Sequence, residues 1–152
     1  MTKYFLGLDI GGTKTACALA DEHKILGRAK AGSAKVLRVG KAEAAVHLAE
    51  VLDAVSRESG VALAEVTASC IGTAGASVPE VTDFLREQMA SRVGGTLTLV
   101  GDEVIALDAA FPGEQGILVV AGTGSIVIGR DSSGWTTIAG GWGPALGDEG
   151  SG

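Results

Sequence analysis

The sequence predicts an α/β protein whose elements run βββαβαβα and are followed by a second antiparallel β-meander. Two observations predict this order. Three short apolar segments separated by turn residues open the chain, and a long amphipathic helix and further strand–helix pairs follow them. A meander of the same kind then returns after residue 113. We therefore expect a first lobe at residues 1–113 and the beginning of a second, similar lobe at residues 114–152.

The opening meander is predicted from its turns. Strands are expected at Tyr4–Ile10, Thr15–Ala20 and Ile25–Lys30, with a tight turn at Gly11–Thr13 and a polar link at Asp21–Lys24. Apolar runs joined by links this short pair as antiparallel neighbours.

A helix over Lys41–Ser59 follows, and Gly60 is the expected stop at its C-terminus. Its apolar positions recur at the spacing of one helix face. They are Ala45, Leu48, Ala49, Leu52 and Val55.

Two strand–helix pairs complete the first lobe. A short buried strand is expected at Val66–Gly72, and the capping box Ser77–Glu80 with Pro79 opens a helix that runs to about Arg92 and is ended by Gly94–Gly95. The second pair is a strand at Thr96–Val100 and a short helix at Glu103–Phe111, which Asp102 could cap. The second meander has expected strands at Ile117–Ala121, Ile126–Arg130 and Trp135–Ala139.

Charge and cysteine content exclude several function classes. The chain has 12 Lys and Arg against 18 Asp and Glu, a net charge of −6, so nucleic acid and anionic membrane surfaces are unsuitable partners. Cys17 and Cys70 stand singly in apolar segments and are expected to be buried thiols of a reducing cytoplasm. His23 and His47 have no ligand-like neighbours and are expected to be solvated. We find neither a secretory signal nor an apolar stretch long enough to span a bilayer.

Two glycine-rich turns are the candidate functional motifs. Residues 6–13 and 118–125 are each an apolar strand that runs into a turn with glycines and a hydroxyl, which indicates a duplicated unit. Successive amides in such a turn can surround a phosphate, because glycine has no Cβ to block the approach. Asp9 beside the first turn would repel phosphate without a cation, so it favours Mg²⁺ held partly through water. Each turn taken alone is equally compatible with a plain hairpin.

Other phosphate-binding loops do not fit. Gly7 and Gly12 nearly match the P-loop spacing, but Lys14 comes one residue late and a strand is expected to follow instead of a helix. The dinucleotide fingerprint lacks its third glycine after Gly122 and Gly124.

Four segments together resemble a known family. They are residues 9–15 (DIGGTKT), 72–75 (GTAG), 122–125 (GTGS) and 141–151 (GWGPALGDEGS). In this order they resemble the N-acetylglucosamine kinase and BadF/BadG/BcrA/BcrD-type ATPase family, of the actin, sugar kinase and Hsp70 superfamily. The resemblance implies a ribonuclease H-like, actin-like ATPase fold and covers essentially the whole chain.

The resemblance also implies roles for single residues. Asp102 corresponds to the catalytic base, although Gly101 precedes it where the family usually has Asn, and a simple helix cap is an equal alternative. Asp9 would hold Mg²⁺. The implied contacts to the phosphates of ATP are Gly11, Gly12, Thr13, Lys14, Thr15, Gly122 and Thr123. The implied contacts to sugar are Asp102, Gly124, Ser125, Gly141, Trp142, Gly143 and Asp148, with core packing the favoured alternative for Trp142. Lys35 falls near a sugar-contacting Asn of the family, so that contact looks altered.

The leading hypothesis is ATP-dependent phosphorylation of an amino sugar, N-acetylglucosamine or glucosamine, in the cytoplasm, by a protein that uses Mg²⁺. One alternative is an ATPase that activates a 2-hydroxyacyl-CoA dehydratase-type enzyme, and another is a non-catalytic sugar-binding module. In this family the second lobe continues with helices that form the adenine pocket, so 152 residues look like a truncated kinase that is inactive by itself. The sugar and ATP are the expected partners, and homodimer formation stays open.

Overall fold

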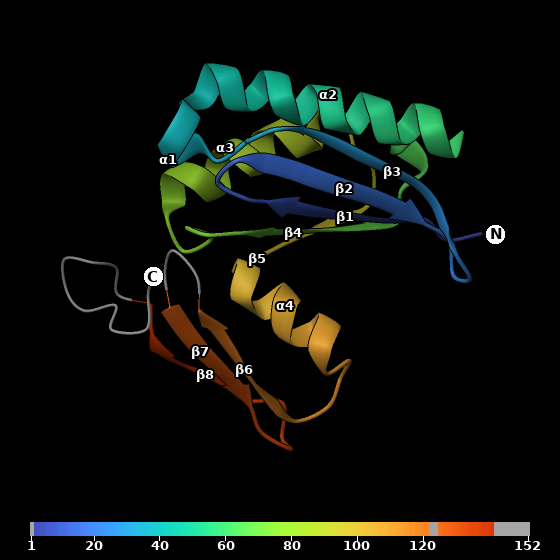
Figure 1. Ribbon diagram of the computed structural model, residues 1–152. Coiled ribbons are helices and arrows are strands. Elements are labelled where there is room, and N and C mark those ends of the chain that lie inside the picture. The colour runs from blue at the N-terminus through green and yellow to red at the C-terminus, as the bar shows by residue number, and fades with distance from the viewer. Residues whose placement is uncertain (1, 122–124, 142–152) are drawn as a thin grey trace. The chain divides into compact units, whose positions relative to one another are not determined.

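The computed structural model describes residues 2–121 and 125–141 (Figure 1). The chain forms two compact units, Met1–Asp102 and Glu103–Gly152. The boundary expected after Gly113 stays a prediction, and each unit is described below by itself.

The first unit contains a five-stranded sheet with the strand order β3-β2-β1-β4-β5. The opening meander is confirmed, since β1 (Phe5–Ile10), β2 (Lys14–Ala20) and β3 (Ile25–Gly32) pair as antiparallel neighbours. The strands β4 (Ala68–Thr73) and β5 (Thr96–Val100) extend the sheet in parallel from β1. The central strand β1 therefore has a sequence neighbour on one side and a strand from far along the chain on the other.

Helices cover one face of this sheet. Helix α2 (Lys41–Ser59) follows the short helix α1 (Val36–Val39). A single 3₁₀ turn, η1 (Leu63–Glu65), precedes β4, and α3 (Pro79–Ala90) follows it. Figure 1 shows α2 running along the sheet above β1–β3. Alternate residues of β1 point into the core that both long helices share, while Phe5 and Asp9 are exposed on the opposite face.

The end of α2 agrees with the sequence, but its buried face is shifted. Gly60 adopts the left-handed conformation (φ 71°) that suits glycine, and its amide donates to the Ser56 carbonyl. Val51 is fully buried, whereas Ala45 and Ala49 lie half-buried at the flank of the face. The buried residues are Ala44, Leu48, Val51, Leu52 and Val55.

Two other expectations are wrong, and one element is additional. The N-cap of α3 is Val78 and not Ser77, so the expected capping box does not form, and Pro79 occupies the first turn with no side-chain cap. Helix α1 was not predicted. His47 is not fully solvated, because its Nδ1 lies 2.8 Å from the Ser33 carbonyl and its ring packs where a Cβ on Gly32 would stand.

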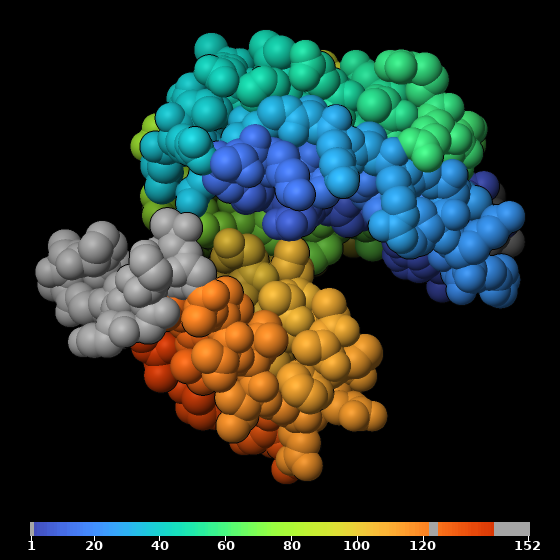
Figure 2. Space-filling view, viewed as in Figure 1, coloured from blue at the N-terminus to red at the C-terminus, as the bar shows by residue number. Residues whose placement is uncertain are grey.

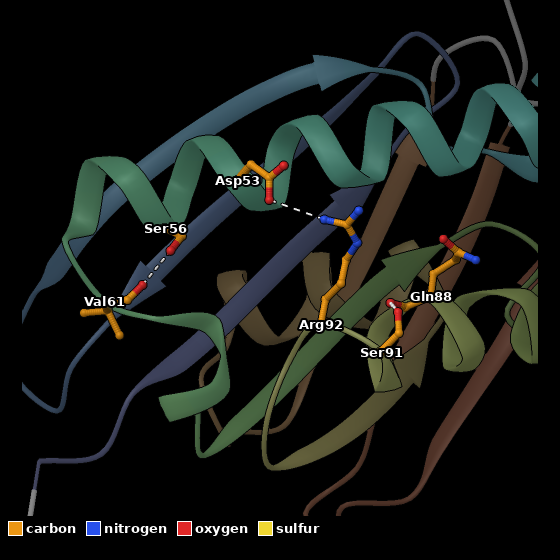
Figure 3. A network of polar contacts seen from close by, with 6 residues as sticks. All are labelled: Asp53, Ser56, Val61, Gln88, Ser91 and Arg92. Carbon is orange, nitrogen blue, oxygen red and sulfur yellow. Dashed lines mark hydrogen bonds and ion pairs between the residues drawn. The ribbon is translucent and has the colours of Figure 1, made fainter.

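Polar contacts join α2 to the segments beside it (Figure 3). Arg92, just after α3, pairs with Asp53 at 3.3 Å between Nη1 and Oδ1. The Ser56 hydroxyl donates to the Val61 carbonyl at 2.7 Å, beyond the end of α2. Because the ion pair is largely exposed, it contributes little to stability, and the apolar core carries most of the packing.

The two cysteines differ in their surroundings. Cys17 is buried, and burial raises the pKa of its thiol to about 12, which confirms the expected buried thiol. Cys70 is half-buried, in register with Gly7 on the face of the sheet opposite to Cys17. No helix in the described part of the chain is long and apolar enough to cross a membrane.

The second unit contains a three-stranded antiparallel sheet in the order β6-β7-β8. Its elements are α4 (Asp102–Ala110), which begins at the boundary, β6 (Gly116–Ala121), β7 (Ser125–Arg130) and β8 (Thr136–Gly140). Arg130 fixes the link between α4 and β6, since its guanidinium donates to the carbonyls of Phe111 and Glu114 and to the Asp108 carboxylate.

One face of this small sheet is open. Ile117 and Val119 are 70% and 65% exposed, and β8 is exposed along its whole length. Figure 2 shows these strands, in orange and red, at the surface of the unit. Ile128, on the other face, is fully buried.

Candidate functional site

The parallel strands of the first unit bring most of its predicted site residues to one edge of the sheet. β1, β4 and β5 end at Ile10, Thr73 and Val100, and Asp9, Gly72 and Val100 are in register across the three strands. The β1–β2 turn, the segment after β4 and Asp102 all follow these ends. Ligand sites of α/β sheets form at the carboxyl ends of the strands, so this edge is the candidate site.

The β1–β2 turn presents amides outward. The Gly11 amide is already donated to the Lys14 carbonyl at 3.0 Å, which closes the turn. Within the residues that the structure describes, the amides of Gly12 and Thr13 have no hydrogen-bond partner. Two successive unpaired amides in a glycine turn are donors for an anion.

Two carbonyls of the same turn accept hydrogen bonds from side chains outside it. The Ser33 hydroxyl donates to the Gly11 carbonyl at 2.8 Å, and the Arg38 guanidinium donates through Nη1 to the Gly12 carbonyl. Both side chains come from the segment between β3 and α2, which includes α1. The turn therefore has the Gly11 and Gly12 carbonyls engaged and the amides of Gly12 and Thr13 open.

Thr15, unlike Thr13, is not open to a ligand. It is fully buried on the core face of β2, and its Oγ1 accepts the Ala34 amide at 2.9 Å. The structure thus brings Thr13 and Lys14 to the surface of the turn but not the Thr15 hydroxyl, which braces the segment after β3.

Asp9 lies where a cation could be held. Its side chain is exposed on the face opposite to the core, and its neighbours in register are the small residues Ala16 and Gly72. Lys14 lies on the same face of β2 as Ala16, because residues two apart on a strand share a face. In the described segments no group of three His, Cys, Asp or Glu could enclose a metal. One exposed carboxylate with room beside it suits Mg²⁺, which keeps several waters and shares the phosphates of its ligand.

The segment after β4 is tied to the β1–β2 turn. The Thr73 hydroxyl donates to the Ile10 carbonyl at 3.4 Å and is buried. Gly75 has φ 90°, a conformation that L side chains rarely adopt, and its carbonyl accepts the Val78 amide at 2.9 Å. Leu37 of α1 reaches this turn, since a Cβ on Gly75 would lie 3.6 Å from Leu37 Cδ1. Helix α1 therefore contacts both turns at this edge.

Asp102 is exposed, two residues after β5, and is the first residue of α4. A carboxylate at a helix N-terminus is stabilised by the unpaired amides there. The position of Asp102 is equally compatible with two roles, a proton acceptor at the sheet edge and a carboxylate that caps the helix.

The predicted residues of the second unit are described only in part. Ser125 is the first residue of β7, and Gly141 follows β8 with φ 72° and packs against Ile126. Gly122, Thr123, Gly124, Trp142, Gly143 and Asp148 lie outside the described residues.

Sequence reasoning missed Ser33 and Arg38. Neither is part of a glycine-rich motif, and both act on the turn from residues more than twenty positions away. The one local signal is Gly40, which separates α1 from α2 with φ 80° and marks a break before the long helix.

The chain resembles known kinases over nearly its whole length. It is 37% identical over 153 aligned residues to the N-acetylmuramic acid/N-acetylglucosamine kinase of Clostridium acetobutylicum, an alignment that covers 99% of this chain and 50% of the relative. The chain thus spans about half the length of that relative.

Two solved structures also match nearly the whole chain. A candidate N-acetylglucosamine kinase from Chromobacterium violaceum matches with a TM-score of 0.77 and 29% identity, over 98% of this chain and 52% of that one. A second candidate N-acetylglucosamine kinase, from Porphyromonas gingivalis, matches with a TM-score of 0.78 and 28% identity, over 97% of this chain and 51% of that one.

These matches confirm the predicted α/β actin-like ATPase fold, a mixed five-stranded sheet with helices and a three-stranded antiparallel sheet. The model of one family covers residues 6–152, from β1 through all the described elements. The chain belongs to the BadF/BadG/BcrA/BcrD ATPase family.

Proposed function

We propose that this chain is part of an ATP-dependent kinase that phosphorylates a hydroxyl of an amino sugar, N-acetylglucosamine, glucosamine or N-acetylmuramic acid. One observation carries the proposal: the β1–β2 turn keeps the amides of Gly12 and Thr13 open and the Gly11 and Gly12 carbonyls engaged. The chain that carries this turn matches an N-acetylmuramic acid/N-acetylglucosamine kinase over nearly its full length.

In this proposal each site residue of the first unit has a role that follows from its chemistry. The amides of Gly12 and Thr13 and the Lys14 ammonium bind the phosphates of ATP, and Gly11 gives the turn its shape. Asp9 holds Mg²⁺, which supplies charge neutralisation for phosphoryl transfer when it is bound. Asp102 accepts the proton of the sugar hydroxyl.

The second unit supplies the remaining contacts in this proposal. Gly122 and Thr123 bind phosphate, and the sugar contacts are Gly124, Ser125, Gly141, Trp142, Gly143 and Asp148. The chain spans half of the kinase that it matches. We propose that the adenine pocket lies in the other half, so that residues 1–152 alone do not turn over ATP.

The two cysteines of this chain are badly placed to serve the dehydratase-activator alternative. An activator that transfers electrons needs cluster ligands, and Cys17 and Cys70, the chain's two cysteines, lie on opposite faces of the sheet. Burial also keeps the Cys17 thiol protonated.

A coupled assay of ADP release tests the proposal. A longer gene product that carries this chain is incubated with ATP and Mg²⁺ and with N-acetylglucosamine, N-acetylmuramic acid, glucosamine or glucose, and residues 1–152 are assayed beside it. We expect sugar-dependent ADP release with at least one amino sugar from the longer protein and none from residues 1–152.

Sugar-independent ATP hydrolysis by the longer protein would refute the kinase proposal and favour the activator. Sustained sugar-dependent turnover by residues 1–152 would refute the proposal that the adenine pocket is missing.

A further inference from the structure

We infer that Arg38 is a positioning residue for the phosphate-binding turn: its guanidinium engages the Gly12 carbonyl, the acceptor between the two open amides that would face an anion. The inference rests on the proposed function of the β1–β2 turn. It adds a residue, and a role for helix α1, that the glycine motif does not contain.

The first step concerns the carbonyls. A carbonyl oxygen that faces an incoming phosphate repels it, so a turn that binds phosphate must direct or neutralise its own acceptors. The Gly11 carbonyl is engaged by the Ser33 hydroxyl at 2.8 Å, and the Gly12 carbonyl by Arg38 Nη1. Arg38 thus neutralises the acceptor that lies between the two open amides, those of Gly12 and Thr13.

The second step concerns space. A Cβ on Gly12 would lie 3.1 Å from Arg38 Nη1, tighter than nine in ten real Cβ contacts. The absence of a side chain at residue 12 therefore leaves the guanidinium room to reach the backbone, and a Cβ there would push it aside by a few tenths of an ångström. Gly12 and Arg38 are therefore expected to act as a matched pair.

The third step concerns what holds Arg38. Helix α1 is only four residues long, and the Lys35 carbonyl accepts the Arg38 amide at 2.8 Å. The Lys35 amide in turn donates to Ser33 Oγ at 3.2 Å, and Leu37 reaches the turn at Gly75, where a Cβ would lie 3.6 Å from its Cδ1. The segment from Ser33 to Arg38 is thus a brace that is anchored to both turns.

The fourth step concerns charge. Among the described residues the Arg38 side chain has no acidic partner, and its contact with Gly12 uses Nη1. A guanidinium is a fork of five donors, so the nitrogens other than Nη1 can face the same anion as the turn. In a chain of net charge −6, this cation and Lys14 provide local attraction at the turn.

The test measures binding of inorganic tripolyphosphate with Mg²⁺ to residues 1–152 by backbone amide NMR. The variants are Arg38→Met and Arg38→Ala, which remove the guanidinium, and Arg38→Lys, which keeps the charge but not the fork. Gly12→Ala and the double variant of Gly12→Ala with Arg38→Met complete the set. Arg57→Met is the matched control, because Arg57 is an exposed arginine at the end of α2. Thermal unfolding of each variant is recorded in parallel.

We expect the Gly12 and Thr13 amides of the wild type to shift on binding. Arg38→Met should weaken binding about tenfold, Arg38→Lys should be intermediate, and Arg57→Met should bind as the wild type does. Melting temperatures should stay within roughly 2 °C of one another, because Arg38 is exposed. Methylguanidinium should partly restore binding to Arg38→Ala and not alter binding by Arg57→Met.

Three outcomes overturn the inference, and they are distinguishable. If the wild type shows no shift at Gly12 and Thr13, the proposed function fails and the inference with it. If the wild type binds and Arg38→Met binds equally well, only the inference fails. It also fails if Gly12→Ala and Arg38→Met weaken binding additively in the double variant, since a matched pair must couple.

Discussion

Thr13, Lys14 and Thr15 are adjacent in sequence and differ in what they reach. Because successive side chains of a strand alternate between faces, Lys14 is exposed while Thr15 is fully buried. The buried hydroxyl must find a partner, and it does so in the Ala34 amide. Strand alternation, and not residue type, decides which hydroxyl is open to a ligand.

Asp102→Asn tests the proposed base. In a longer protein that carries this chain, the amide cannot accept the hydroxyl proton, so kcat for sugar phosphorylation should fall by roughly 10²- to 10⁴-fold. Sugar affinity, measured by calorimetry, should change by no more than a few fold, since the amide keeps the size of the side chain and one acceptor oxygen.

Asp83→Asn is the control for this variant, because Asp83 is an exposed carboxylate on α3. Turnover by Asp102→Asn at the rate of the control would remove Asp102 from the mechanism and leave it as a residue at the start of a helix.

Among the elements, the turn at Asp131 between β7 and β8 carries the clearest electrostatic signature. One carboxylate oxygen accepts the Ser133 hydroxyl at 2.6 Å and the amides of Ser133 and Trp135 at 2.8 and 3.0 Å. The Ser133 hydroxyl, followed by the amides of the turn, lowers the pKa of Asp131 below its ordinary value of 3.8. All these bonds favour the charged form.

The prediction concerns pH. Because the pKa is lower in the fold than in the unfolded chain, the stabilisation by Asp131 is fully present above about pH 4 and is lost as the pH falls through the folded pKa. Ser133→Ala removes the largest cause, so the Asp131 titration midpoint, followed by carboxyl-carbon NMR, should rise toward 3.8.

Ser91→Ala is the control, since Ser91 bonds only to its own helix end at the Gln88 carbonyl and lies in the first unit. An Asp131 midpoint that is the same in both variants would mean that the hydroxyl does not set it.

Most elements could be predicted from the sequence because their signals are local. The spacing of apolar residues and Gly60 place α2 at Lys41–Ser59, and the turn residues place the strands of both meanders within two residues. The capping box predicted at Ser77 was wrong because a serine followed by Glu80 also fits a loop. Pro79 was the stronger signal for the first turn of α3.

The brace between β3 and α2 could not be predicted, for a physical reason. Helix α1 has four residues, too few to show a helical period in the sequence. Its role depends on where Arg38 lies relative to Gly12 and where Leu37 lies relative to Gly75. Such contacts depend on strand order, which places the β1–β2 turn and the β4 end side by side. The glycine motif indicated the location of the site, but not the side chains that orient it.

For the molecule as a whole, the cores of the two units are unequal. Every member of the large apolar cluster lies in the first unit, from β1 to α3, while Leu107 and Ile128 are the buried apolar side chains in the described part of the second. The first unit therefore contains its own core, and the second leaves Ile117 and Val119 in solvent.

We expect residues 1–102 to fold alone. Because the cluster is complete within them, this fragment should show dispersed amide signals and a cooperative thermal transition by circular dichroism. Residues 103–152, expressed separately as the control, should show neither. A fragment 1–102 that unfolds without a transition would show that its core needs the second unit.

The pairing of β1 with β4 also means that β1 must wait for its partner strand during synthesis on the ribosome. Ile10 and Thr73 are partners in the sheet yet stand 63 residues apart. At about 5–20 residues per second, roughly 3–13 s pass between the emergence of the two strands. During that interval β1 can pair with β2 alone, and its other edge is open to neighbouring nascent chains. Slowing translation between β3 and β4 should therefore lower the soluble yield, although no contact of the finished protein is altered.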